Sequence, residues 1–561
     1  MKRFISIILV TILLIANVTV ISFADEQPLT VAVANDVHLN IERSTSPVKK
    51  NNSENEDFFH AGHGGQMPEE SLAIATAFFE KVASDESDVL LLPGDIADSG
   101  TIEQHTAMAK MLAELEEKSG KEVFVVPGNH DLFKTTLSDF RAVYRDFGYG
   151  DAIAVDTLSG SYVAELNNEY RLLAIDSTNP GLSPHGMTQQ RLEWIVKQCL
   201  QAQADGKKVI AMMHHNLVEH FVLAKVLHKT AIVNGDVNIA EALATNGVKF
   251  IFTGHTHDTD IAAYTAEDGS VIYDIVTGAL FSYPCPYRVV EFSDNVTFEM
   301  RNVTAVDASL LPPGITENAM HLAQTDMVEY SKICTWIGIR NTIVSYTKAS
   351  SLKNLLKLDK EKDAQMYTIV DKIGNRISEF LQLPLYADDV AAGEMSVETY
   401  LAEYDVAIPA SKYKDIVDIA VEIFQAHVVG DEYFPGYSDE VVCVVRGLAG
   451  VLHYAFAELT PEEYTEILSY IASMLNVELP AGLLQYAGTA VSRMRGIELF
   501  FTTAIMPLIC EYTVDDGPAD NNVTLEGYSE VAADGNFFRQ IIDFFKHLID
   551  ALLTFFTHFF A

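Results

Sequence analysis

Residues 248–257, VKFIFTGHTH, join an apolar run to two histidines that are separated by a single residue. A short, continuous apolar run is typical of a strand buried on both faces. Histidines are common metal ligands, although two alternating histidines could also face solvent. The same arrangement, an apolar run followed by Asp, Asn or His, occurs four more times before residue 248. This recurrence decides the predicted fold.

The other four polar segments also follow apolar runs. They are DVH at 36–38 after 29–35, GDIAD at 94–98 after 89–93, GNHD at 128–131 after 123–127, and HHN at 214–216 after 208–213. Helical patterns at 69–83, 102–117 and 188–204 lie between several of the runs. Strand–helix alternation predicts α/β units, in which ligands collect where the carboxyl ends of the strands meet. We therefore expect the five segments to lie together.

Each segment alone has a simpler interpretation. Asp-x-His could be a turn beside a surface histidine, and Gly-Asp-x-x-Asp a turn with a helix-capping Asp. Gly-Asn-His-Asp could be a turn with a left-handed Asn, and His214 or His215 a core histidine. Five such segments, each at a strand end, instead favour two divalent metals held side by side. Metal-assisted hydrolysis of phosphate esters is the chemistry that such a pair predicts.

Together, D-x-H, G-D-x-x-D, G-N-H-D, H-H and G-H-x-H resemble the motifs of the calcineurin-like metallophosphoesterases. The resemblance covers about residues 29–304, and every ligand position is filled. It implies an α/β (α+β) fold, a four-layer β-sandwich flanked by helices. The compact spacing from Gly94 to Gly128 is similar to that of the bacterial cyclic-nucleotide phosphodiesterase branch.

The resemblance also implies a role for each site residue. One metal would be held by Asp36, His38 and His257, the other by Asn129, His214 and His255, and Asp95 would bridge them. His130 would lie over the leaving group, and Asp131 would steer it. The cofactors would be two divalent ions, with Mn, Fe, Zn, Co and Ni all open, and a metal-bridging hydroxide would attack phosphorus.

Four points stay open from the sequence. Asp98 either supports a ligand or caps the following helix. Asn216 stands where many relatives have proline, so the choice of His214 over His215 as the ligand is less secure. Phosphodiester hydrolysis is favoured over phosphomonoester hydrolysis. The alternative function is a cell-surface binding protein with a structural or degenerate metal site. His130 and Asp131 argue against it, because neither is needed to hold a metal.

Composition limits the partners. The 561 residues carry a formal net charge of -40, which excludes nucleic-acid binding through a basic surface. We expect a small phosphate-ester substrate, with the metals supplying the local positive field. The 5 cysteines are scattered, without C-x-x-C spacing, so they form neither a disulfide framework nor a zinc ribbon.

The remaining segments complete the predicted domain organisation. Residues 1–24 read as a signal peptide, with an uncleaved membrane anchor as the alternative, and predict a secreted or cell-surface protein. The polar stretch 39–68 is either a surface loop or a lid over the metals. Residues 317–512 predict an all-α domain, with helices at 319–339, 352–383, 413–427 and 461–475, and 513–535 an acidic linker. An amphipathic helix at 536–561 either packs on its own domain or, as we favour, binds a membrane interface or self-associates.

Overall fold

The computed structural model describes residues 28–48, 64–178, 186–220, 231–235, 237–391, 393–430, 432, 434–435, 437–474, 494, 497–498, 501–512 and 517–528. The predicted signal peptide at 1–24 and the predicted amphipathic helix at 536–561 lie outside these residues. Two mixed β-sheets form the centre of the described part, accompanied by a two-stranded ladder of β7 (Gly186–Met187) and β9 (Asn234–Gly235).

The first sheet has six strands in the order β15-β14-β13-β1-β2-β3. Their bounds are Asn522–Glu526, Asn295–Asn302, Pro286–Phe292, Leu29–Val33, Val89–Leu92 and Glu122–Val125. Strands β1, β2 and β3 are parallel, with Val31 opposite Val89 and Leu90 opposite Val123. Every residue of β1 and β2 is buried, as their continuous apolar sequences predict.

The second sheet has seven strands in the order β11-β12-β10-β8-β6-β5-β4. Their bounds are Asp260–Thr265, Val271–Val276, Val248–Thr253, Lys208–Met213, Tyr170–Ile175, Tyr162–Glu165 and Ala154–Val155. Strands β6, β8, β10 and β12 are parallel, so the carboxyl ends of β8 and β10 point the same way. The predicted strands at 208–213 and 248–253 are confirmed.

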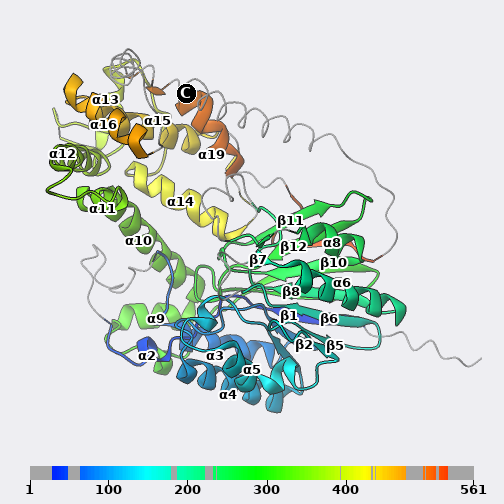
Figure 1. The fold of residues 1–561 in the computed structure, drawn as a ribbon. Coiled ribbons are helices and arrows are strands. Elements are labelled where there is room, and N and C mark those ends of the chain that lie inside the picture. Colours follow the sequence, from blue (N-terminus) through cyan, green and yellow to red (C-terminus); the bar gives the residue numbers. More distant parts are fainter. Residues whose placement is uncertain are drawn as a thin grey trace, which may run out of the picture.

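Helices cover the outer faces of both sheets (Figure 1). On the first sheet lie α3 (Ser71–Val82), α4 (Ile102–Ser119) and α5 (Leu137–Val143), with the short α2 (Ile41–Ser44), η1 (His130–Leu132) and η2 (Arg145–Tyr149) nearby. On the second lie α6 (Gln189–Ala204) and α8 (Ile239–Thr245). One apolar core joins the sheets, with Leu90 and Val290 from the first beside Phe250 and Phe252 from the second. The predicted four-layer β-sandwich flanked by helices is therefore confirmed.

The predicted helical region is also confirmed. After η3 (Ala308–Leu310), the described helices are α9 (Glu317–Thr325), α10 (Met327–Thr347), α11 (Ala349–Leu355), α12 (Ala364–Phe380), η4 (Ala387–Asp389), α13 (Val397–Ala402), α14 (Ile416–Val429), α15 (Asp439–Phe456), α16 (Pro461–Met474), η5 (Phe501–Ile505) and α19 (Met506–Tyr512). Figure 1 shows α10 and α14 connecting the sandwich to the helices farther away. Met327 and Cys334 of α10 belong to the core of the sandwich.

Two predicted helices are each divided in two. The predicted helix at 319–339 consists of α9 and α10, because Asp326 ends the first and caps the second, accepting from the backbone N–H of Glu329 at 3.0 Å. The predicted helix at 352–383 breaks between α11 and α12, where Lys357 has a left-handed φ of 52°. Neither break interrupts the helical period strongly enough to be seen in the sequence.

The predicted acidic linker at 513–535 contains a strand. Residues 522–526 form β15, which pairs antiparallel with β14 at the edge of the first sheet. Just before it, the Asp520 carboxylate accepts from the backbone N–H of Ile261, and the Asp520 carbonyl accepts from the buried guanidinium of Arg288. The linker prediction is wrong for this part, because pairing with a distant strand gives a polar segment its hydrogen bonds.

All five cysteines are buried and free in the structure. Within the part of the chain that the structure describes, no individual helix is long and apolar enough to cross a membrane. One bent pair, Asp439–Phe456 with Pro461–Ile467, meets the length and composition test when taken together.

Candidate metal centre

All five polar segments lie at the carboxyl ends of β1, β2, β3, β8 and β10, and their backbones turn sharply there. Five predicted ligands have left-handed φ values: Asp36 at 49°, His38 at 45°, Asp95 at 48°, His255 at 71° and His257 at 66°. Non-glycine residues adopt this region in only about a few per cent of cases. Such strain concentrates at functional sites, where it aims side chains that regular backbone would not.

Glycines permit the close approach of these loops. A Cβ on Gly128 would lie 2.2 Å from Asp95 Oδ1, and a Cβ on Gly254 would lie 2.5 Å from Asp36 Oδ2. Neither distance is sterically allowed, so both positions require glycine for space. The two motifs therefore use glycine to bring the backbone against a carboxylate.

The first donor set contains Asp36, His38 and His257. Asp36 Oδ1 lies 3.7 Å from His38 Nε2 and 3.4 Å from His257 Nε2. The other Asp36 oxygen accepts from the backbone N–H of His255 at 2.9 Å. One oxygen of the carboxylate is thereby fixed, while the other faces two imidazoles across a gap suited to an ion.

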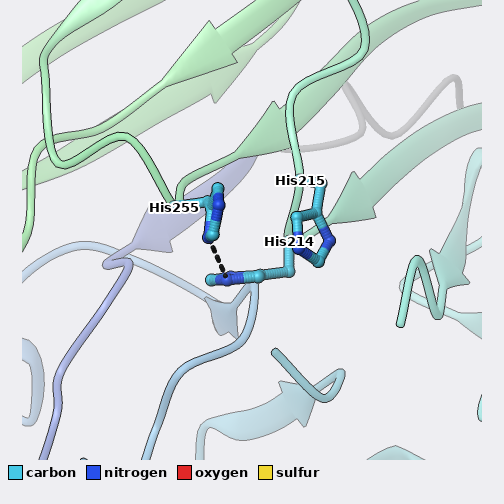
Figure 2. Close-up of side chains that lie close together, drawn as sticks. All are labelled: His214, His215 and His255. Carbon is cyan, nitrogen blue, oxygen red and sulfur yellow. Dashed lines mark hydrogen bonds between the residues drawn. The ribbon is translucent and has the colours of Figure 1, made fainter. Parts of the chain in front are cut away.

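The second donor set contains Asn129, His214 and His255. His214 Nε2 lies 3.0 Å from Asn129 Oδ1 and 3.1 Å from His255 Nδ1. Figure 2 shows the rings of His214 and His255 meeting at this contact, with His215 beside them. His215 instead places Nδ1 2.7 Å from the hydroxyl of Ser177. The side chain at 214 therefore faces the predicted ligands, as the favoured register requires.

Asp95 lies between the two sets. Its Oδ2 is 3.5 Å from His38 Nε2 and 3.3 Å from His214 Nε2, so a single oxygen faces one imidazole of each set. Its Oδ1 accepts from the backbone N–H of His130 at 2.7 Å. The structure thus brings together all seven residues predicted as ligands, with Asp95 in the shared position.

The second nitrogen of three inward-facing imidazoles lies near a supporting group. His214 Nδ1 donates to the carbonyl of Pro93 at 3.1 Å, and His38 Nδ1 lies 3.6 Å from Asp98 Oδ1. The side-chain amide of Gln66 lies 3.1 Å from His257 Nδ1. Such contacts fix ring orientation and tautomer in metal sites.

Asp98 and Gln66 settle two points that the sequence left open or missed. Asp98 supports His38, and it is not the cap of α4, because Thr101 accepts from the N–H of Gln104 in that role. Gln66 follows a long polar segment and has no motif of its own, so only the fold places it beside His257. The end of the 39–68 segment therefore reaches the site.

His130 is oriented by the loop that follows β2. Its Nδ1 donates to the carbonyl of Asp98 at 2.6 Å, and its ring meets that of His38 edge to face, with 4.6 Å between centroids. A carbonyl can only accept, so Nδ1 carries the proton. His130 Nε2 is then the nitrogen that can act on a bound substrate.

The structure corrects the predicted role of Asp131, which does not steer His130. Its carboxylate accepts from the backbone N–H groups of Ala97 and Gly128 at 2.9 Å each, and of Ile96 at 3.3 Å. The 3₁₀ turn at 130–132 directs consecutive side chains to different sides, so Asp131 is fully buried while His130 is only partly buried. Asp131 ties together the loops that carry Asp95 and Asn129.

The charges of the cluster favour the ionised form of its carboxyl groups, which is the form that binds a metal. Burial opposes ionisation of Asp36, but His257 and His38 outweigh it and hold the pKa of this carboxyl well below its usual value. Asp95 is likewise buried, yet His214 and His38 lower its pKa. Both carboxylates are therefore anions at neutral pH.

The buried imidazoles divide into two kinds. Burial lowers the pKa of His214, but Asp95 and Asp36 reverse the effect and raise it to about 9. Burial and the neighbouring His214 lower the pKa of His255 to about 3, so this ring stays neutral. A cluster of anionic oxygens and closely spaced imidazoles can exchange protons for metal cations.

The donor atoms fit a pair of divalent ions. Asp36 Oδ1 and His38 Nε2 are buried without a hydrogen-bond partner among the described residues. Buried polar atoms are normally paired, so these two require a further partner. Carboxylate oxygens, an amide oxygen and imidazoles are the donors that divalent transition metals accept.

A four-layer α/β/β/α sandwich with Asp, Asn and His gathered at its strand ends is the architecture of the metallophosphoesterase class. The sequence model of the calcineurin-like phosphoesterase family matches residues 29–259. The domain that these residues form belongs to the calcineurin-like phosphoesterases.

Individual relatives match only part of the chain. A probable glycerophosphodiester phosphodiesterase GpdQ from Arcobacter nitrofigilis is 31% identical over 128 residues, 23% of this chain and 41% of that protein. A dimetal phosphatase from Danio rerio is 12% identical, with a TM-score of 0.35 over 49% of this chain and 96% of its own. Purple acid phosphatase PPD1 from yellow lupin is 12% identical, with a TM-score of 0.34 over 50% and 52%.

Proposed function

We propose that this chain is an exported, dinuclear metal-dependent phosphodiesterase. The observation that carries the proposal is the position of Asp95, whose single oxygen faces one imidazole of each donor set. A carboxylate shared in this way is what two adjacent divalent ions need. The N-terminal pattern of the sequence supports export.

The residues that would hold the ions follow from the geometry. Asp36, His38 and His257 would hold one, and Asn129, His214 and His255 the other. Two bound divalent ions would act as Lewis acids on the phosphoryl group and would offset its negative charge. This local field is necessary in a chain whose net charge is -40.

His130 would provide the proton for the leaving alcohol. The Asp98 carbonyl accepts from Nδ1 of His130. The Asp95 carboxylate accepts from the backbone N–H of His130 at 2.7 Å. These contacts fix the ring beside His38. His130 also lies within metal-binding reach of His38 and Asp95, and our proposal gives it the role of acid and not of ligand. A general acid must lie within hydrogen-bond reach of the leaving oxygen before its pKa can affect the rate. Both contacts hold His130 in position.

The preference for diesters is supported by the partial similarity to a relative named as a glycerophosphodiester phosphodiesterase. We expect the metal-loaded chain to hydrolyse bis(p-nitrophenyl) phosphate with a higher kcat/KM than p-nitrophenyl phosphate, measured by release of p-nitrophenol. A higher kcat/KM for the monoester would overturn the diester preference. Absence of turnover of both esters with metals bound would instead favour a binding protein.

A further inference from the structure

Two short backbone segments, residues 64–67 and 279–282, run side by side next to the first donor set. The backbone N–H of Met67 donates to the carbonyl of Phe281 at 2.9 Å. On its other side, the segment 279–282 pairs with Asn35, which directly precedes the first metal-binding motif. The two segments therefore continue the row of backbone that begins at the carboxyl end of β1.

Both imidazoles of the first donor set contact these segments. The ring of Phe281 stacks on that of His38, with 4.6 Å between centroids and 27° between planes. Phe281 is buried, and a side chain in a close-packed interior has little freedom to move away from its neighbour. The side-chain amide of Gln66 lies 3.1 Å from Nδ1 of His257. The orientation of both rings therefore depends on where the two segments lie.

Helix α10 of the helical region presses on the segment 64–67. The hydroxyl of Thr335 donates to the carbonyl of Gly65 at 3.0 Å. A Cβ on Gly338 would lie 2.5 Å from the backbone nitrogen of Gly65, so helix and segment are in direct contact. Arg340 of the same helix forms ion pairs with two carboxylates at the start of α14. The helical region thus supports the segment that carries Gln66.

The second donor set has supports within the sandwich. His214 Nδ1 donates to the carbonyl of Pro93 at 3.1 Å. The backbone N–H of His255 donates to the Asp36 carboxylate at 2.9 Å. Because these contacts involve neither α10 nor the segment 64–67, a shift of that segment should affect the two donor sets unequally.

The geometry of His257 defines what Gln66 would have to supply. Nε2 of His257 faces Asp36 Oδ1 at 3.4 Å, so Nε2 is the nitrogen that an ion between them would use. The ring proton is then on Nδ1, which needs an acceptor. The amide nitrogen of Gln66 faces Nδ1 in the structure, and a half-turn of the amide presents its oxygen instead.

We infer that Gln66 is a positioning residue for the first metal, and that the helical region controls the affinity of this ion through α10. The side-chain oxygen of Gln66 accepts from the Nδ1–H of His257 and fixes the ring with Nε2 toward the ion. Partners of this kind set the orientation and tautomer of a ligating histidine. The inference rests on the proposed dinuclear centre and gives the helical region a role in it.

The first test compares Gln66→Met, which keeps the length of the side chain and removes the acceptor, with Gln66→Glu, which keeps the acceptor. Both dissociation constants for Mn or Zn are measured by titration of the chelated full chain. Gln66→Met should raise one constant about 10–100-fold, the usual cost of losing such a partner, and change the other less. Gln66→Glu should restore binding, because a carboxylate accepts from Nδ1–H equally well. Gln382→Met, at an exposed position after α12, is the matched control and should change neither constant.

The second test moves α10 without touching a ligand or Gln66. Thr335→Val removes the hydroxyl that holds Gly65 and keeps the shape of the side chain. Gly338→Ala forces the helix and the segment apart. Both should weaken the same ion that Gln66→Met weakens. Gly374→Ala is the control, because its Cβ would lie 2.6 Å from the backbone of Ala349, an equally close contact within the helical region.

An Asn129→Ala background identifies the affected ion, because it removes a ligand of the second donor set. The loss of affinity caused by Gln66→Met should persist in this background. Its disappearance there would show that Gln66 acts on the second ion and would overturn the inference.

The outcomes also separate the inference from the proposed function. If the unmodified chain binds fewer than two ions, the dinuclear proposal fails, and the inference fails with it. If it binds two ions and Gln66→Met changes neither constant, or both equally, only the inference is wrong. Equal losses in Gln66→Met and Gln66→Glu would refute the acceptor role. Unchanged constants in both α10 variants would refute control by the helical region.

Discussion

Replacement of Asp95 by alanine should remove both bound metals and all measurable phosphoesterase activity. Asp95 Oδ2 is the oxygen that faces both donor sets, at 3.5 Å from His38 Nε2 and 3.3 Å from His214 Nε2. Without Asp95, each donor set keeps its three ligands, but no ligand is shared between the two metals. Loss of an outer-shell partner already costs about 10–100-fold in metal affinity, so loss of the shared ligand should exceed this range.

Asp95→Asn is the sharper companion variant. It preserves the size of the side chain and an oxygen that can accept from the N–H of His130, yet it removes the bridging charge. Elemental analysis and turnover of bis(p-nitrophenyl) phosphate measure the two effects, with Asp146→Ala as a control at an exposed position. Full metal content and activity in both Asp95 variants would show that another residue connects the ions.

Replacement of His130 by alanine should lower kcat by roughly 10²–10⁴-fold, the usual size of a general-acid contribution. The variant should retain its metals, because His130 is held by the Asp98 carbonyl and lies outside both donor sets. The loss should be larger for an ester with a poor leaving group than for a nitrophenyl ester. The reason is that p-nitrophenolate departs without needing a proton.

Steady-state kinetics on a nitrophenyl and an alkyl diester, together with metal analysis of the same sample, measure this effect. His321→Ala, at an exposed position on α9, is a matched histidine control. Wild-type turnover of the alkyl ester by His130→Ala would refute the general-acid role. Loss of metal would instead make His130 a ligand.

The sequence was sufficient for the catalytic half of the fold. The strands at 208–213 and 248–253 coincide with β8 and β10, because a continuous apolar run bounded by polar residues admits few other structures. The positions of the predicted ligands also follow, since the carboxyl ends of parallel strands share an edge. The relation between His214 and Asn129 also requires the packing of the two sheets against each other, because β8 and β3 belong to different sheets.

Other features depend on contacts between distant residues and could not be predicted. Gln66 reaches His257 across 191 positions, and β15 gains its hydrogen bonds only by pairing with β14. Asp131 is directed away from His130 by the geometry of one short turn. His427 lies 3.7 Å from Asp258 only because α14 is placed against the loop that carries Asp258.

The most direct test of the proposed function is the metal stoichiometry of the active chain. The chelated full chain should be titrated with Mn or Zn while bound metal and turnover of bis(p-nitrophenyl) phosphate are measured in the same samples. Binding should saturate at two ions per chain, with full activity reached only at the second equivalent. Saturation at one ion, or full activity with one or none, would contradict the dinuclear assignment.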